Sequence, residues 1–385
     1  MYPRWKIALS SLLFGLLPSP ESLGDRPNIL LIYTDDQGSA DARCYGALDL
    51  HTPAMDSLAR RGVRFTQMLA PAAVCSPSRA GLLGGCIPMR LGAPGNISSS
   101  RGGKGLSPGL YLLPEALKEA GYRTHHVGKW HLGYTDETMP NSQGFDTSFG
   151  HMGGCVDNFS HFFYWNGPNR HDLWRNGTEV WHDGTSFGDL MVEEARAVIR
   201  AKDERPFFVY WAINWPHYPL QGSAKWRAYY RDRKLPHPRD KYAAFLSTMD
   251  ELIGQVVSEV DLSGKRKDTI IIVQSDHGHS VEERTFGGGG SSGPFRGHKF
   301  SFLEGGLRVP SIISWPSTLP AGETRDQFVT GCDWYPTLAK WAKAPLPADM
   351  RLDGRDISRV IHSSEAPSPH TVSYTHLTLP TNREV

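Results

Sequence analysis

Three uninterrupted apolar runs lie far apart in the chain, and each of them stops abruptly at polar residues. The runs cover residues 27–34, 206–214 and 269–275. Continuous apolar runs of this length are typical of strands that are buried on both faces. Segments with helical patterns lie between the runs, at residues 54–61, 113–120, 187–201 and 241–260. Strands that alternate with helices predict an α/β fold with a mostly parallel central sheet and helices on both faces.

The polar residues after these runs are the first candidates for a functional site, because such sheets bind ligands beyond the carboxyl ends of their strands. Asp35 and Asp36 follow the first run, His217 comes shortly after the second, and Asp276 and His277 follow the third. Adjacent carboxylates repel each other, and a buried pair usually holds a cation. Carboxylates without thiolates favour calcium or magnesium. The alternatives are a solvated turn at the Asp-Asp-x-Gly sequence and a histidine that merely belongs to the core.

A second candidate is Cys75, which a tight Ser-Pro-Ser turn separates from Arg79. A planar guanidinium recognises oxyanions, so the segment indicates an activated nucleophile beside an anion-binding arginine. The alternatives are a buried thiol and one half of a disulfide. The chain has five cysteines and no C-x-x-C pair, so a structural zinc site is not expected and any disulfide pairing stays open.

Charge and the N-terminal segment restrict the partners and the compartment. The chain carries 41 basic and 40 acidic residues, so no overall field would attract nucleic acid or an anionic membrane. Residues 1–24 combine basic residues, a short apolar stretch and prolines, which is typical of a secretory signal peptide, although an ordinary buried helix is the alternative. We therefore expect an exported protein (secreted, periplasmic or lysosomal) with no membrane attachment after signal removal.

The sequence around Cys75 resembles the sulfatase family, whose C-x-P-S-R signature matches residues 75–79. Five more motifs occur here in the order of that family: PNILLIYTDDQG from residue 27, VGKWHLG from residue 127, NWPH from residue 214, SDHG from residue 275 and GHKFSFLEGGLRVP from residue 297. The pattern is similar to arylsulfatases and to glycosaminoglycan sulfatases of the N-acetylgalactosamine-6-sulfatase type. The resemblance implies an alkaline-phosphatase-like fold in a catalytic domain spanning residues 25–361.

This resemblance implies that Cys75 is converted to formylglycine by a formylglycine-generating enzyme. The hydrated aldehyde would attack the sulfur of a sulfate ester, carried by a sulfated carbohydrate or by an aryl alcohol. One calcium ion (Ca2+) per chain would be bound by an oxygen of the modified Cys75 and by the side chains of Asp35, Asp36, Asp276 and His277. Histidine is a less favourable calcium ligand than an oxygen, which leaves the identity of the metal open.

The resemblance also implies roles for five cationic or titratable residues. Arg79 and Lys129 would orient and polarise the hydrate, and His131 would act as a general base. His217 and Lys299 would bind the sulfate and support protonation of the departing alcohol. Clustered positive groups suit this reaction because negative charge develops on the leaving oxygen in the transition state.

The chain departs from the family pattern in two places. The family usually continues toward Leu-Thr-Gly-Arg, whereas this chain has Leu-Gly-Gly-Cys at residues 83–86. That element helps the modifying enzyme to recognise its target, so conversion of Cys75 is expected to be less efficient. The smaller C-terminal subdomain of the family is expected to be truncated, with residues 362–385 forming an atypical tail, disordered or foreign to the fold.

Two other functions stay open on the sequence. A phosphodiesterase or phosphonate hydrolase of the same superfamily would share the metal carboxylates, although many such enzymes need further His and Asp ligands for a second metal. A non-catalytic binder of sulfated glycans would follow if Cys75 stays a thiol. Residues 151–175, rich in glycine, histidine and aromatic residues, either line a sugar pocket or form a covering loop.

Overall fold

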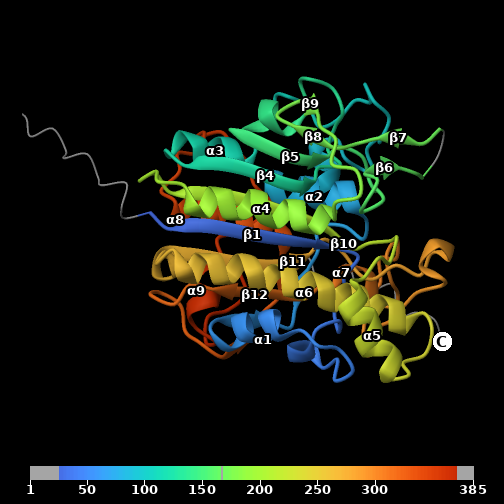
Figure 1. Cartoon of the computed structure of the whole chain (residues 1–385). Coiled ribbons are helices and arrows are strands. Elements are labelled where there is room, and N and C mark those ends of the chain that lie inside the picture. The colour runs from blue at the N-terminus through green and yellow to red at the C-terminus, as the bar shows by residue number, and fades with distance from the viewer. Residues whose placement is uncertain (1–25, 166–167, 371–385) are drawn as a thin grey trace, which may run out of the picture.

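A sheet of ten strands runs through the computed structural model, which describes residues 26–165 and 168–370 (Figure 1). Its five central strands are parallel to one another. In sheet order they are β11 (Thr269–Ser275), β1 (Asn28–Asp35), β10 (Phe207–Pro216), β4 (Arg123–Lys129) and β5 (Thr147–His151). The three apolar runs of the sequence are thus three adjacent strands, and the predicted α/β fold class is confirmed.

Short strands extend the sheet on both sides. Beyond β11 the order is β12 (Ser311–Ser314), β2 (Val63–Phe65) and β13 (Glu323–Arg325). Beyond β5 the order is β8 (Trp174–Arg175) and β9 (Thr178–Glu179). Two small sheets stand apart, formed by β3 (Met68–Leu69) with β14 (Val329–Thr330) and by β6 (Phe162–Phe163) with β7 (Arg170–His171).

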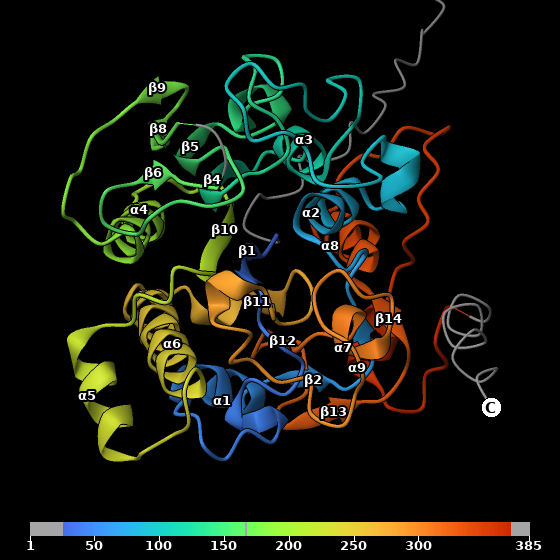
Figure 2. The same cartoon turned by 90° about the vertical axis from the view of Figure 1, so that its right-hand side faces the viewer.

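Helices cover both faces of the sheet (Figure 2). One face carries α1 (Pro53–Arg60), α4 (Phe187–Arg200), α5 (Ala224–Asp232) and α6 (Arg239–Leu262). The other carries α2 (Cys75–Gly84), α3 (Leu113–Glu119), α8 (Trp334–Trp341) and α9 (Ser358–His362), and α7 (Glu304–Leu307) is a single turn. Side chains of β1 alternate between the two cores: Leu30 and Ile32 pack with the first group of helices, and Leu31 packs with the second. Burial on both faces explains why the strand sequence is apolar throughout.

The four predicted helices are α1, α3, α4 and α6, each within two residues of its expected ends. α1 begins at Pro53, whose missing N–H has no helical partner to lose in the first turn. Ser186 caps α4 by accepting a hydrogen bond from the backbone N–H of Asp189. The predicted Ser-Pro-Ser turn is instead the first turn of α2. All residues of α2 are buried, so its sequence lacks the amphipathic pattern by which a helix is recognised, and Pro77 is tolerated near its start.

The two ends of the chain, residues 1–24 and 362–385, lie partly or wholly outside the described residues. The predicted signal peptide, residues 1–24, lies outside the described residues. None of the helices in the described ranges is long and apolar enough to cross a membrane. The first part of the predicted tail packs on the body of the protein: Gln327 Nε2 donates to the carbonyl oxygens of Ser364 and Ala366, and His370 Nε2 lies 2.9 Å from the Asp333 carboxylate. Residues 371–385 of that tail lie outside the described residues.

Candidate active site

The predicted site residues come together at the edge where the central strands end, which faces the viewer in Figure 2. Asp35 is the last residue of β1 and Lys129 the last of β4, while Asp276 follows β11 and His217 follows β10. Parallel strands present their carboxyl ends at one edge, so residues more than a hundred positions apart become neighbours. All the metal, nucleophile and cationic candidates are buried.

The adjacent aspartates Asp35 and Asp36 reach the same cluster because the backbone leaves the strand conformation between them. Successive side chains of a strand point to opposite faces, but Asp36 has a φ of 66°, in the left-handed region. Each carboxylate has its own ammonium group: Lys129 Nζ lies 2.6 Å from Asp35 Oδ2, and Lys299 Nζ donates to Asp36 Oδ2 at 3.1 Å.

A group of four ligand-type side chains lies at the centre of this edge. The candidate ligand atoms of Asp35, Cys75, Asp276 and His277 all lie within 4.8 Å of one another. His277 Nε2 is 3.3 Å from Asp276 Oδ1 and 3.3 Å from Cys75 Sγ. His277 Nδ1 donates to the Gly278 carbonyl oxygen at 3.0 Å, so once the ring has lost its second proton on binding a cation, the lone pair lies on the Nε2 atom that faces the carboxylates. This orientation suits a metal ligand.

The electrostatics of the group favour a bound cation. Burial raises the pKa of Asp36 to about 7 and that of Asp276 to about 6, and the charge of Asp35 adds to both shifts. Asp276 and Cys75 outweigh burial and raise the pKa of His277 to about 9. Asp36 Oδ1 lies 3.0 Å from Lys299 Nζ but accepts no well-directed hydrogen bond within the described structure. The carboxylates of Asp35, Asp36 and Asp276 supply oxygen ligands and negative charge, which suit a hard dication such as calcium.

Cys75 is the first residue of α2, so its thiol lies at the positive end of a helix dipole. Burial opposes ionisation, but Lys129 and Lys299 lower the pKa of the Cys75 thiol to about 6. By contrast, burial raises the pKa of Cys155, another buried thiol, to about 11. A lowered pKa is typical of a reactive thiol rather than a structural one.

The two serines of the motif attach the start of α2 to the ends of neighbouring strands. Ser76 Oγ donates to the carbonyl oxygen of His131 at 2.7 Å, just beyond β4. Ser78 Oγ donates to the carbonyl oxygen of Asp276, just beyond β11. The serines of the motif therefore fix the position of Cys75 relative to the ends of β4 and β11.

The divergent segment at residues 83–86 lies at the opposite end of α2. Gly85 has a φ of 63°, and a Cβ atom there would lie 2.8 Å from the Cβ of Tyr335, which accounts for a glycine at this position. Cys86 Sγ donates to the carbonyl oxygen of Arg351 at 3.2 Å. At the helical rise per residue, α2 holds Cys86 about 15 Å from Cys75, so its thiol is remote from the nucleophile.

Arg79 completes the charge pattern. Its Nη2 atom lies 2.9 Å from Asp276 Oδ2 and 3.6 Å from Asp35 Oδ2. Asp276 outweighs burial and raises the pKa of Arg79, as Asp35 does for Lys129. The buried aspartates and the buried cations thus balance one another. A dication would leave the site positive, which suits the binding of an oxyanion.

Two neutral histidines complete the site. Burial lowers the pKa of His131 and of His217 well below the ordinary value, with Lys129 and Lys299 acting in the same direction. His217 Nδ1 donates to the Tyr218 carbonyl oxygen at 2.8 Å, which leaves Nε2 as a base. The ring of His131 packs against Gly154, where a Cβ atom would come within 2.7 Å of its Cε1 atom.

A cavity of about 250 Å³ opens at this cluster. Four predicted residues line it, namely Cys75, His131, His217 and Lys299. The segment at residues 151–175 contributes Phe163 and Trp165 to the wall. Two other aromatic residues of that segment point elsewhere: His161 Nε2 lies 3.1 Å from the Thr185 carbonyl oxygen, and the Tyr164 hydroxyl donates to the Tyr218 carbonyl oxygen. Some residues of this segment therefore line the cavity, and others hold neighbouring loops in place.

Several wall residues were not singled out from the sequence. They are the polar segment 96–100 together with Tyr218, Glu282 and Phe300. Tyr218 follows the NWPH motif directly, and Glu282 lies four residues after the SDHG motif, so nearness to a motif was the available signal for these two. The serines of the segment 96–100 carry no such signal, because polar loop residues of this kind are common at any surface.

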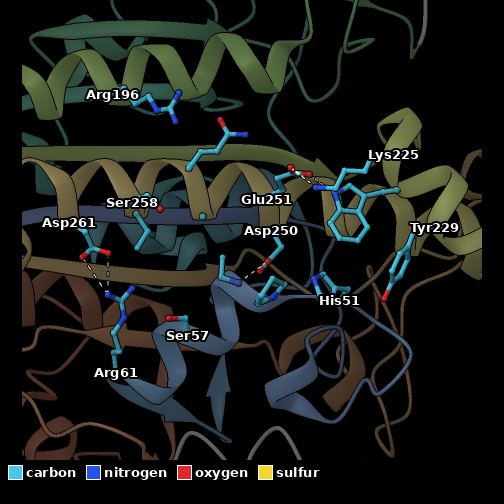
Figure 3. Close-up of a pocket in the computed structure, with 16 residues that line it drawn as sticks. His51, Ser57, Arg61, Arg196, Lys225, Tyr229, Asp250, Glu251, Ser258 and Asp261 are labelled. Atoms are coloured by element: carbon cyan, nitrogen blue, oxygen red, sulfur yellow. Dashed lines mark hydrogen bonds and ion pairs between the residues drawn. The ribbon is translucent and has the colours of Figure 1, made fainter.

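A larger groove of about 1100 Å³ lies between α1, α5 and α6 (Figure 3), and no predicted site residue lines it. Its charged groups pair with one another: Lys225 Nζ lies 2.8 Å from Glu251 Oε1, and Arg61 lies 3.3 Å from Asp261. The Asp250 carboxylate accepts backbone N–H groups at the start of α1. Size alone therefore does not identify the active site of this protein.

Known proteins are similar to this chain over most of its described length. The family model described as Sulfatase matches residues 27–344. Arylsulfatase J from Mus musculus is 33% identical over 341 residues, which cover 87% of this chain and 56% of that protein. N-acetylgalactosamine-6-sulfatase from Rattus norvegicus is 31% identical over 366 residues, which cover 89% of this chain and 68% of that protein. The chain thus spans little more than half of Arylsulfatase J.

A solved structure is similar over a comparable length. The crystal structure of Ps i-CgsB in complex with k-i-k-neocarrahexaose has a TM-score of 0.81 to this chain at 30% sequence identity. The match covers 90% of this chain and 78% of that one. Taken with the family model, which matches most of the residues, these similarities show that the chain belongs to the sulfatase family.

Proposed function

We propose that this protein hydrolyses sulfate esters of carbohydrates at the buried cluster around Cys75. The observation that carries the proposal is the position of the Cys75 thiol. It lies at the start of α2, 3.3 Å from His277 Nε2, and its pKa is lowered by two buried lysines. The names of the relatives support the substrate class: one is an N-acetylgalactosamine-6-sulfatase, and one structural neighbour was crystallised with a neocarrahexaose.

The nucleophile would be formylglycine, made from Cys75 by a formylglycine-generating enzyme. When present, the hydrated aldehyde would supply an oxygen nucleophile for the sulfur of the ester. Its second hydroxyl would allow sulfate to be released afterwards, which a thiol would not. Arg79 and Lys129 would orient the reacting groups, and both side chains are already fixed by Asp35 and Asp276. Rigid support of this kind keeps the cost of reorganisation during the reaction low.

Calcium would be held by Asp35, Asp36, Asp276 and His277, with an oxygen derived from Cys75. When bound, the ion supplies positive charge that offsets the charge of the ester in the transition state. The buried carboxylates with raised pKa values support this assignment.

Proton transfer would fall to the residues around the cavity. His131 is neutral, so it is able to accept a proton as the general base. The ammonium group of Lys299 would donate a hydrogen bond to the leaving oxygen, and His217 beside it would support protonation of the departing alcohol. Both side chains line the cavity from which the alcohol would leave.

The test begins with co-expression of the chain and a formylglycine-generating enzyme, followed by mass spectrometry of the tryptic peptide 65–79. The aldehyde at Cys75, together with calcium-dependent sulfate release from sulfated sugars, is the expected result. Turnover of bis(4-nitrophenyl) phosphate without any sulfate release would instead select a phosphodiesterase. Tight binding of sulfated glycans by protein that keeps the Cys75 thiol and releases no sulfate would select a non-catalytic binder.

The proposal includes export, directed by residues 1–24. The N-terminal sequence of protein recovered outside the cytoplasm should begin close to residue 25. An intact N-terminus on protein retained in the cytoplasm would contradict it.

A further inference from the structure

Among the described residues that line the catalytic cavity, Glu282 is the one acidic residue. Its Oε2 atom lies 3.3 Å from Lys299 Nζ, and the Tyr218 hydroxyl lies at the same distance. Ser280 Oγ donates to Glu282 Oε2 at 2.9 Å and accepts a hydrogen bond from the Glu282 N–H at 3.2 Å. The carboxylate is therefore held in a defined place, with its side chain 20% exposed toward the cavity.

The surrounding cations do not neutralise this carboxylate completely. Lys299 is shared, because its ammonium group also lies 3.0 Å from Asp36. Two arginines lie near the cavity but are absent from its lining: Arg284 lies over the ring of Trp165 and donates to its carbonyl oxygen, and Arg170 lies over another aromatic ring of the wall. A ligand in the cavity therefore meets the negative charge of Glu282 directly.

The position of Glu282 relative to Lys299 determines which part of a substrate it meets. If Lys299 contacts the leaving oxygen, a carboxylate 3.3 Å away faces the neighbouring substituent of the sugar ring. In a galactose-type sugar, the O4 and O6 atoms sit on carbons two bonds apart and can approach to about one hydrogen-bond length, so the O4 hydroxyl beside a 6-sulfate falls within reach of Glu282. A carboxylate accepts a hydrogen bond from a hydroxyl and repels a sulfate.

We propose that Glu282 selects sugars that carry one sulfate, with a free hydroxyl beside the ester that is cleaved, and rejects sugars with a second sulfate there. This inference rests on the proposed sulfatase function and names its substrate class. The site would thus act on a sugar ring whose only charged group is the sulfate ester to be cleaved, or on a ring from which another hydrolysis has already removed the second sulfate.

Glu282 also contacts Lys299, so a purely positioning role has to be distinguished. Loss of positioning would weaken the binding of every sulfated sugar to a similar extent, because each of them needs Lys299. Loss of charge selection would change the ratio between two sugars that differ in one sulfate. The ratio is therefore the informative quantity.

The experiment is calorimetry with the calcium-loaded Cys75→Ala variant of the full chain, which binds sugars without hydrolysing them. The two probes are N-acetylgalactosamine 6-sulfate and N-acetylgalactosamine 4,6-disulfate. With Glu282 present, the disulfate should bind roughly tenfold more weakly than the monosulfate, and Glu282→Gln should abolish most of that difference. Salt should also reduce the difference, because the carboxylate is partly exposed.

Glu283→Gln is the matched control, because Glu283 is exposed and lies outside the cavity lining. It should leave the ratio of the two dissociation constants unchanged. Equal losses for both sugars in Glu282→Gln would assign Glu282 to positioning Lys299 alone and overturn the inference. Equal or tighter binding of the disulfate when Glu282 is present, or binding of neither sugar, would overturn it as well.

The proposed function is tested separately by sulfate release from the aldehyde-bearing enzyme. If that enzyme releases no sulfate while the variants show the expected binding ratio, the proposed hydrolysis is wrong and the charge selection by Glu282 stands. If sulfate is released and the ratio is unaffected by Glu282→Gln, the hydrolysis stands and the selection is wrong.

Discussion

The Nζ atom of Lys129 lies 2.6 Å from the Oδ2 atom of Asp35, and both side chains are fully buried. Removing Lys129 leaves the buried Asp35 charge with Arg79, 3.6 Å away, as partial compensation, and breaking such a buried pair costs about 3–5 kcal/mol. We expect Lys129→Met to lower the free energy of unfolding by that amount in urea titrations at neutral pH. Lys118 forms a pair of 2.8 Å with Asp146 but is 51% exposed. The control Lys118→Met should cost less than about 1 kcal/mol, and equal losses would contradict the argument.

The Cys75 thiol should react at unusually low pH in protein that has not been converted. Lys129 and Lys299 hold its pKa at about 6, and the thiolate is the reactive form. The rate of alkylation by iodoacetamide should therefore rise as the pH increases through 6 and then level off, as followed by mass spectrometry of the peptide 65–79. Lys299→Met should move the midpoint to higher pH. A rate that continues to rise as for an ordinary thiol would show that the lysines do not act on Cys75.

Gly154→Ala should disturb His131 without unfolding the protein. A Cβ atom at this position would lie 2.7 Å from the His131 Cε1 atom, so the ring has to move. Displacement of a catalytic group by about 1 Å costs about a hundredfold in rate, and we expect a loss of that order in kcat for sulfate release.

Gly254→Ala is a suitable control for Gly154→Ala. Its nearest contact would be 3.4 Å from Ala54 Cβ, and Gly254 lies inside α6. Alanine there should stabilise the helix by up to about 1 kcal/mol and leave kcat unchanged. An unaffected kcat in Gly154→Ala would remove His131 from the catalytic step.

Calcium should stabilise the folded protein, because the buried carboxylates repel one another without a cation. The Tm should rise with calcium concentration, and a thousandfold excess over the Kd corresponds to about 4 kcal/mol. Sodium chloride at equal ionic strength is the control, and Asp276→Asn should reduce the response. An identical Tm in calcium and in chelator would contradict the metal assignment.

Asp250 should make stability depend on pH. Its carboxylate, 1% exposed, accepts the backbone N–H groups of Ala54 and Met55 beside the groove of Figure 3, and burial raises its pKa to about 7. Since the pKa of Asp250 is higher in the folded than in the unfolded protein, the protonated carboxyl stabilises the folded state. This stabilisation is fully present below about pH 4 and is lost as the pH rises through 7. Relative to Asp250→Asn, the natural protein should lose about 2–3 kcal/mol between pH 5 and pH 8. A constant difference in unfolding free energy would show that the folded carboxyl is already ionised.

The sequence by itself determined the three middle strands of the central sheet and the place of the site. A strand buried on both faces is usually apolar along its length, so the runs at β1, β10 and β11 are visible without any tertiary information, whereas the buried but polar strand β4 is not. Parallel strands end at the same edge of a sheet, so the polar residues that follow each run, such as Asp35 and Asp276, lie close together there. The Cys75 motif and its companions in the sulfatase pattern then supplied the candidate chemistry.

Only the tertiary structure decided what surrounds that chemistry. The helix α2 is buried on all sides, so it lacks the periodic pattern that predicts helices, and the sequence predicts a turn where α2 begins. The walls of the cavity come from loops that contact one another although they are far apart in the chain, and such contacts produce no periodic pattern in the sequence. His161 therefore lies away from the cavity while Glu282 faces it. Periodicity encodes which face of an element is buried, whereas contacts between distant loops depend on the packing of the whole chain.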